Sequence, residues 1–577
     1  MKKLITAATL VALVVLLTAA RQSFAQSGTL VLYASTDTLN TVIGGDTTST
    51  GQQKHAVYQL VSLDTTYLFD GTVTSKSGIQ IVGVPDPSTG RLPCVQPAVL
   101  SDGSLPGTFF ACNGTGANIV FKNLYLLGIA TDNTVNYGGG QAVQLSADSI
   151  KFTADNVVFE QWSQFAIGYQ GSWDKIFVTN CKFRNMTTLP NQWYVGEAIR
   201  NENYVGAFPT DSIVMKYNTM LCVSGYATAA TGGIVNYYEF SHNDVIYTFK
   251  NPFFLDRMVN AKFDNNIFYN AYAGGENKTE YAGWDSFTPN TGPSIITMGP
   301  LDSLTAARLL GHSITTSADS AAAEAARKVE VKNNDYYWSS GLTSFWTAWN
   351  DTAHVDSIYT PTFMNAVTEA MFSNATKWPG FVQSGNQNVD PGFGASINAV
   401  LNSGVGNGDG LLNWFTAVRT GVGTTQTYGY QITQVGSAAN WTPAWPLHEA
   451  TDLQYTNASL KGSSTDGKPL GDPYWFNGLQ SVKTLPGAVP TKFELSNNYP
   501  NPFNPSTDIK VSLAHAGVIS LTVYNVLGQV VDVVDQGYKP AGQYLYNVNM
   551  DRFASGVYFY SLRQGTNVIT KKMLLLK

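Results

Sequence analysis

Residues 152–159 read Phe-Thr-Ala-Asp-Asn-Val-Val-Phe, which is a short apolar strand, an asparagine and a second apolar strand. The same pattern recurs through the middle of the chain. Its copies lie at 120–126, 152–159, 177–183, 215–221, 240–246, 263–268 and 331–337. The asparagines of the first six copies are 33, 24, 38, 25 and 22 residues apart. The shortest spacings match one turn of a parallel β-solenoid, and the longer ones indicate turns that carry loop insertions.

The asparagine in each copy has a local physical role. A sharp corner between two strands needs a residue near the left-handed region, which asparagine tolerates better than other non-glycine residues. Stacked coils would place each asparagine above the last, so that their amides bond along a column, as in cross-β stacks. The alternative is that asparagine marks unrelated turns. The predicted column contains Asn123, Asn156, Asn180, Asn218, Asn243, Asn265 and Asn334.

The C-terminal part has a different pattern, with short alternating strands between Gly, Pro and Asn turns. This pattern predicts a small β-sandwich. Three motifs occur in order, at Tyr499–Thr507, Leu521–Val531 and Ser555–Tyr560, before the basic-apolar end Lys571–Lys577. Together they resemble the type A C-terminal sorting domain of the type IX secretion system. The resemblance implies a Bacteroidetes-like envelope, export by that machinery, and release or anchoring at the cell surface. We assign it residues 491–577, after a linker at 482–490.

The N-terminus also indicates export. Lys2 and Lys3 precede an apolar run from Leu4 to Ala20, and the small residues Ser23 and Ala25 precede a plausible cleavage site. This arrangement predicts a Sec signal peptide over residues 1–25. No other segment approaches eighteen consecutive apolar residues, so we expect no transmembrane segment in the mature chain.

Composition limits the classes of function. Only 13% of the residues are charged, and the net charge is −6. Without a basic stripe to displace counterions from phosphates, a nucleic-acid partner is not expected. The four cysteines fit an oxidising compartment. Cys94 and Cys112 flank a Gly/Pro-rich loop and are the better disulfide candidates, whereas Cys181 and Cys222 are as compatible with buried free thiols.

The region from Thr29 to Phe476 resembles the pectate-lyase-like superfamily, and its closing segment Ser464–Phe476 is similar to the end of many exported Bacteroidetes β-helix proteins. The resemblance implies an all-β protein, with a right-handed parallel β-helix over 26–481 followed by the small C-terminal β-sandwich. Ala- and Lys-rich sequence predicts a helical insertion near 304–328, and Pro361 at a first turn predicts another at 361–372.

Polysaccharide lyases of this superfamily need a basic residue and a cation, often calcium. The motifs of pectate lyases and polygalacturonases are absent from the sequence, as is a transition-metal motif. One constellation remains, upstream of the asparagine corners. Arg200 or Arg257 would act as the base, and Glu202 and Asp256 would hold a cation. The further candidate ligand residues are Gln144, Glu197 and Asn236, with Tyr237, Tyr238 and Trp284 as sugar contacts. The alternative is a solvated sheet face with ordinary ion pairs.

Three functions therefore remain open. The first is a non-catalytic surface protein for structural assembly, adhesion or glycan binding, with polysaccharide or a second copy of itself as partner. The second is a secreted polysaccharide lyase or glycoside hydrolase, which rests on fold analogy. A third is a domain of a modular surface complex whose partner supplies the chemistry. No motif requires a cofactor, and calcium enters only with the lyase hypothesis. The absence of catalytic motifs favours the first.

Overall fold

The structure is a computed structural model of the whole chain. It describes residues 28–577 apart from 35–36, 63–65, 87–88, 133, 137–138, 193–195, 203–207, 231–233, 256, 278–291, 353–356, 405–407, 432–446, 448, 477–482, 486–489, 516, 529, 540, 551–552 and 566. The predicted signal peptide lies outside this range. The chain forms two compact units, Met1–Pro473 and Tyr474–Lys577.

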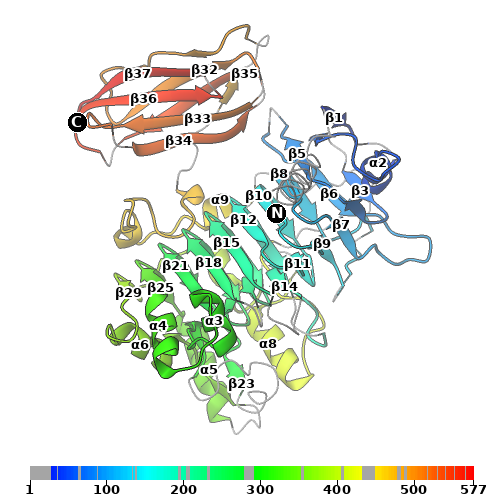
Figure 1. Ribbon diagram of the computed structural model, residues 1–577, viewed down its shortest axis with the longest axis vertical. Coiled ribbons are helices and arrows are strands. Elements are labelled where there is room, and N and C mark those ends of the chain that lie inside the picture. Colours follow the sequence, from blue (N-terminus) through cyan, green and yellow to red (C-terminus); the bar gives the residue numbers. More distant parts are fainter. Residues whose placement is uncertain are drawn as a thin grey trace, which may run out of the picture. The chain divides into compact units, whose positions relative to one another are not determined.

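The first unit is a parallel β-helix built on an 18-stranded sheet and a 7-stranded sheet (Figure 1). The large sheet covers two faces of each coil, because strands β8 and β10 continue around a corner. Its strands are β1 (Thr29–Leu32), β2 (Val57–Val61), β3 (Tyr67–Phe69), β5 (Ile79–Val84), β6 (Cys94–Pro97), β8 (Asn118–Leu127), β10 (Lys151–Glu160), β12 (Lys175–Thr179), β13 (Lys182–Met186), β15 (Thr210–Lys216), β16 (Thr219–Val223), β18 (Val235–Ser241), β19 (Asp244–Thr248), β21 (Met258–Asp264), β22 (Ile267–Tyr269), β25 (Lys328–Lys332), β26 (Asp335–Tyr337) and β29 (Phe381–Ser384).

The 7-stranded sheet forms the third face. Its strands are β4 (Val73–Ser75), β7 (Thr108–Cys112), β9 (Gln141–Leu145), β11 (Phe165–Tyr169), β14 (Glu197–Asn201), β17 (Thr228–Ala229) and β20 (Phe253–Phe254). All pair in parallel and in sequence order, from one coil to the next. The predicted solenoid is therefore confirmed.

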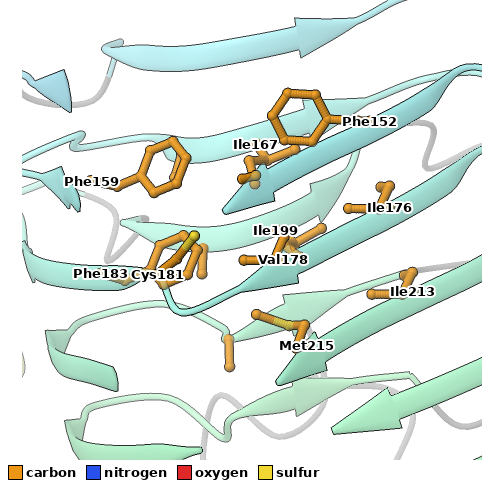
Figure 2. Close-up of a cluster of buried hydrophobic side chains, with 14 of the residues drawn as sticks. Phe152, Phe159, Ile167, Ile176, Val178, Cys181, Phe183, Ile199, Ile213 and Met215 are labelled. Atoms are coloured by element: carbon orange, nitrogen blue, oxygen red, sulfur yellow. The ribbon is translucent and has the colours of Figure 1, made fainter. Parts of the chain in front are cut away.

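Apolar side chains fill the interior of the coils in layers (Figure 2). Equivalent positions in successive coils carry the same kind of side chain, so that like packs on like. The rings of Phe159 and Phe183, for example, stack with centroids 5.0 Å apart and planes 7° apart. These side chains are buried from water, and their burial supplies the main favourable term in folding.

The predicted asparagine column is corrected by the structure, because two columns occupy neighbouring positions of the corner. In the outer column the backbone is left-handed, with φ between 50° and 60°. Its residues are Asn123, Asn156, Asn180, Tyr217, His242, Asn265 and Asn333. Asn218, Asn243 and Asn334 instead lie one position later, in an inner column. The outer and inner columns are one residue apart, and the spacing of asparagines in the sequence does not show to which column each belongs.

The inner column is a continuous hydrogen-bonded ladder. Each side-chain amide donates to the amide oxygen of the next coil, at 2.9 Å from Asn218 to Asn243 and at 3.1 Å from Asn243 to Asn266. The ladder continues from Asn266 to Asn334 at 2.8 Å and from Asn334 to Asn386 at 3.0 Å. Sequence analysis missed Asn266 and Asn386.

Helices cover the sides and the last coil of the β-helix. The insertion near 304–328 contains two helices, and the second begins with a capping box formed by Thr316 and Asp319. Around 361–372 the prediction was wrong in its start, because Thr362–Met364 is a strand and Asn365 caps the helix. The helices are α2 (Leu39–Gly45), α3 (Ser303–Leu310), α4 (Ser317–Ala326), α5 (Ser340–Asp351), α6 (Ala366–Ser373), α7 (Ala395–Ala399), α8 (Leu411–Thr420) and α9 (Glu449–Asp452), with short helices Ala458–Leu460 and Pro473–Trp475. Short strand pairs accompany them, β23 (Glu276–Asn277) with β27 (Ile358–Tyr359) and β24 (Ser294–Ile296) with β28 (Thr362–Met364).

The chain after β29 folds back over the outer side of β13, β16 and β19, the strands that follow the corner and form the second face of the coils. There Arg184 forms a buried ion-pair network with Glu160 and Glu449. The closing segment noted in the sequence belongs to this cover. Its Asp472 accepts from the Lys182 ammonium group at 2.6 Å, and the backbone N–H of Thr465 donates to Asn265 at 2.8 Å. The segment therefore fixes the coils to one another from outside.

The predicted disulfide between Cys94 and Cys112 is wrong in this structure, where both are free thiols. Cys112 packs in the interior of the β-helix, whereas Cys94 packs outside it against Leu92 and Tyr125. The two side chains therefore lie on opposite sides of the coil wall. Burial raises the pKa of each thiol, so both stay protonated and unreactive.

The second unit is an antiparallel β-sandwich of two four-stranded sheets. One sheet contains β30 (Lys483–Leu485), β31 (Glu494–Leu495), β32 (Ser506–Leu513) and β35 (Gly542–Asn549). The other contains β33 (Gly517–Tyr524), β34 (Val530–Lys539), β36 (Gly556–Gln564) and β37 (Asn567–Leu575). Strand β30 occupies part of the predicted linker. Buried residues from both sheets, such as Ile509, Leu521 and Tyr560, form a core separate from that of the β-helix.

Candidate functional site

The candidate site lies on the outer face of the 7-stranded sheet. Gln144, Gly168 and Arg200 occupy equivalent positions on β9, β11 and β14, because each pairs with the next in register. A Cβ atom at Gly168 would lie 2.4 Å from the Glu202 carboxylate, so the glycine provides the space for that group. Gln144 donates from Nε2 to Glu202 Oε1 at 2.9 Å. The coil geometry therefore brings together three of the predicted residues.

Arg200 and Glu197 form an ion pair within this site. The Arg200 guanidinium group donates to Glu197 Oε1, and the residues are only 8% and 0% exposed. A Cβ atom at Gly225 would lie 2.3 Å from Glu197 Cγ, so this glycine lets the carboxyl group approach the sheet. Glu197 Oε2 has no hydrogen-bond partner among the described residues.

Burial changes the acidity of both carboxyl groups. It raises the pKa of Glu197 although Arg200 and Lys250 act in the opposite direction. Burial likewise raises the pKa of Glu202, against the hydrogen bonds from Gln170 and Gln144 and the charge of Arg200. Both carboxyl groups therefore hold a proton to a higher pH than an exposed glutamate does.

An aromatic pair lies at the same face, and sequence analysis did not identify it as part of the site. The rings of Tyr226 and Phe254 stack with centroids 5.0 Å apart and planes 13° apart. The Lys250 ammonium group lies 4.8 Å from the centre of the Tyr226 ring. Phe254 shares a row with Arg200 through Ala229. The sequence did contain a signal for this pair, because the aromatic residue Phe254 is followed closely by the charged residues Asp256 and Arg257.

The other predicted residues lie elsewhere. Arg257 immediately precedes strand β21 of the large sheet, and its guanidinium group lies 2.7 Å from the Asp302 carboxylate. Asn236 lies on β18 of that same sheet, where its carbonyl oxygen accepts from Asn260. Tyr237 is there too and donates to Glu239 at 2.8 Å, whereas Tyr238 is buried in the interior. Asp256 and Trp284 fall outside the described residues. Among the described residues, the structure therefore groups Gln144, Glu197, Arg200 and Glu202 and places Arg257 and Asn236 on the other sheet.

The tryptophans of the helical cover have structural partners. Trp338 and Trp346 donate from their indole nitrogens to the carbonyl oxygens of Ala271 and Ala273, at 2.8 and 2.9 Å. Trp349 packs against Phe415. Among the residues that the structure describes, no group of three or more His, Cys, Asp or Glu side chains is placed to hold a metal ion.

Comparison with known proteins identifies the C-terminal unit. Residues 497–576 match the family model of the secretion system C-terminal sorting domain. No curated protein and no solved structure matches the chain. In the part of the chain with described coordinates, no helix is both long and apolar enough to span a membrane. The chain thus carries a C-terminal sorting domain, by which the type IX secretion machinery delivers it to the cell surface or the extracellular space.

Proposed function

We propose that the exported β-helix is a non-catalytic protein of the cell surface or extracellular space, with a role in structural assembly, adhesion or glycan binding. The observation that carries this proposal is the buried Arg200–Glu197 pair. A general base must reach the proton that it removes. Arg200 is directed at a carboxylate of its own chain, and its charge is neutralised there.

The surroundings of the pair support a structural role in the same way. The Glu202 carboxylate accepts from Gln144, and Arg257 is paired with Asp302. Tyr226 is buried beneath the Phe254 ring, and the half-buried Phe254 ring is the part of this pair that a sugar can reach, so weak glycan binding fits this face. The parallel coils and the asparagine ladder support the proposed relationship to the pectate-lyase-like superfamily.

The test is a turnover assay on the mature chain from Gln26. It is incubated with uronic-acid and neutral polysaccharides, with and without calcium. A lyase produces an unsaturated uronide that absorbs in the ultraviolet, and a hydrolase produces new reducing ends. We expect neither product, and at most weak binding to one glycan in affinity electrophoresis.

The second candidate is a polysaccharide lyase or glycoside hydrolase, and one observation favours it. Two carboxyl groups with raised pKa values, those of Glu197 and Glu202, lie on either side of Arg200. Buried carboxyl groups of this kind serve as general acids in other enzymes. Turnover that is lost in Glu202→Gln and kept in Lys54→Gln, a distant exposed position, would establish this candidate and overturn the first.

A further inference from the structure

The sorting domain has a hollow on the outer face of its second sheet. The hollow has a volume of about 440 Å³ and extends across β33, β36 and β37 to the turn after β33. Its lining includes Tyr524, Val526, Phe559, Arg563 and Val568. It does not belong to the β-helix site, and its role does not depend on the function proposed for the β-helix.

Side-chain size along the strands explains the hollow. Tyr524 pairs in register with Phe559, and two residues further along Thr522 pairs with Ser561, which itself pairs with Thr570. The next row joins Ser520 to Arg563. Short hydroxyl side chains therefore form the floor between an aromatic row and an arginine row. Alternate residues of the same strands, such as Leu521 and Leu562, point into the core.

This face is less polar than the outer face of the other sheet. Phe559, Val568 and Val526 are 36%, 47% and 65% exposed. On the other sheet, the outward positions of β32 include Asp508 and Lys510, and Asp508 accepts from Asn547 at 2.6 Å. Exposed apolar side chains that gather around a hollow and are bordered by polar groups are typical of a binding surface.

The charge of the hollow indicates the kind of ligand. Arg563 is exposed at one end of it, and no carboxylate is among its lining residues in the described part of the domain. Lys572 pairs with Phe559 and adds a second positive charge to the same strand row. An arginine at the end of a row of hydroxyl groups suits a carboxylate, which it binds through two parallel hydrogen bonds.

We propose that this hollow binds an extended, acidic peptide segment of a protein of the secretion machinery. The hydroxyl groups of Thr522 and Ser561 bond to peptide groups of the segment, and Arg563 pairs with its carboxylate. Phe559 and Val568 receive an apolar side chain. The exposed valines favour a peptide over a saccharide, which has no branched apolar group to place against them.

The test compares export of full-length variants in the producing cell. In Arg563→Glu and Ser561→Lys, the fraction of the chain that reaches the surface or medium should fall at least about tenfold, the effect of losing roughly 1.4 kcal/mol of binding. The matched control is Lys510→Glu, a similar charge reversal on the other sheet, which should be exported normally. Thermal unfolding of the purified full-length variants checks that the sandwich is intact.

A cross-linking experiment identifies the class of partner. A photoreactive amino acid replaces Thr570, at the border of the hollow, in the full-length chain. We expect a cross-linked protein that disappears in the Arg563→Glu background and persists with Lys510→Glu. Normal export of folded Arg563→Glu would overturn the proposal, and so would equal loss in Lys510→Glu. If the partner attached by the cross-link stains as glycan and remains after protease has digested the chain, the assignment to a peptide would be overturned.

Discussion

The inner corner position is filled differently in the early and the late coils of one β-helix. In the coils of β8, β10 and β12 it holds Leu124, Val157 and Cys181, which belong to the apolar interior. From β15 onward it holds only asparagine, beginning with Asn218 and ending with Asn386. The backbone path is the same in both halves. A buried amide is therefore tolerated here as a member of an uninterrupted row, in which each donor and acceptor has a partner.

Breaking the row in its middle should have the largest effect. Asn243→Ala removes the acceptor of the Asn218 amide and the donors to Asn266 and to the carbonyl oxygen of Met215. Several buried polar groups lose partners at once, so we expect a loss of about 2–4 kcal/mol in the free energy of unfolding.

The control for this change is Cys181→Ala, at the same position in an apolar coil. It deletes one sulfur atom and should cost only about 1 kcal/mol. Denaturant unfolding of the mature chain, followed by a probe of the β-helix, measures both. Equal losses would show that the amide row stabilises the coils no more than apolar packing does.

A buried carboxyl group next to the row should show itself by pH dependence. Asp335 directly follows Asn334 and is fully buried, and burial raises its pKa from 3.8 to about 8. Between these values the unfolded chain releases this proton and the folded chain keeps it. Stability should therefore fall as pH rises through this window, by up to roughly 1.4 kcal/mol per unit, and level off above pH 8.

Asp335→Asn removes this dependence, because an amide does not titrate. Unfolding of both proteins between pH 4 and pH 9 provides the measurement. We expect the variant to gain stability relative to the unchanged chain as the pH increases. Asp174, whose pKa burial raises to about 7, should behave alike in Asp174→Asn over a narrower window. Parallel pH profiles for the variant and the unchanged chain would contradict the prediction.

Replacing a member of the outer column should have a smaller effect. Asn180 is exposed, has a φ of 56° and makes its side-chain hydrogen bond to Asp155 at 2.8 Å. Asn180→Ala should cost about 1 kcal/mol, mainly because alanine tolerates the left-handed conformation poorly. Asn180→Gly relieves that strain and should cost clearly less. An equal thermal shift for the two variants would mean that the hydrogen bond, not the backbone, dominates.

The two columns also show how far the sequence determines the fold. The recurrence of asparagine predicted stacked coils, but Asn265–Asn266 and Asn333–Asn334 place asparagine at both neighbouring positions, so spacing alone could not separate the columns. Tyr217 escaped notice because bulky residues are uncommon in the left-handed region, and His242 because the asparagine that follows it, Asn243, fitted the repeat. The sorting domain was predictable because its motifs are contiguous.

Contacts between distant segments limited the prediction of the site. Gln144 and Arg200 lie at equivalent strand positions, and Glu202, which directly follows β14, accepts a hydrogen bond from Gln144, so the sequence grouped these three together. Arg257 was misplaced because its partner, Asp302, comes from an insertion whose path the repeat does not specify. The cover over the second face depends on pairs such as Arg184 with Glu449, which no local pattern indicates.

Extending the row by one coil should have the smallest effect. The backbone N–H of Cys181 already donates to Asn218 Oδ1 at 2.9 Å, as later members of the row do to theirs. In Cys181→Asn the new amide would find Asn218 on one side and the backbone of the preceding coil on the other. We expect a change within roughly 0.5 kcal/mol. The contrast is Val157→Asn, one coil earlier, where Cys181 separates the new amide from the row and leaves it without an amide partner in the next coil, at a cost of about 1–3 kcal/mol. Denaturant unfolding of the two variants decides between them. If both are equally destabilised, continuity of the row is not what makes a buried asparagine acceptable at this corner.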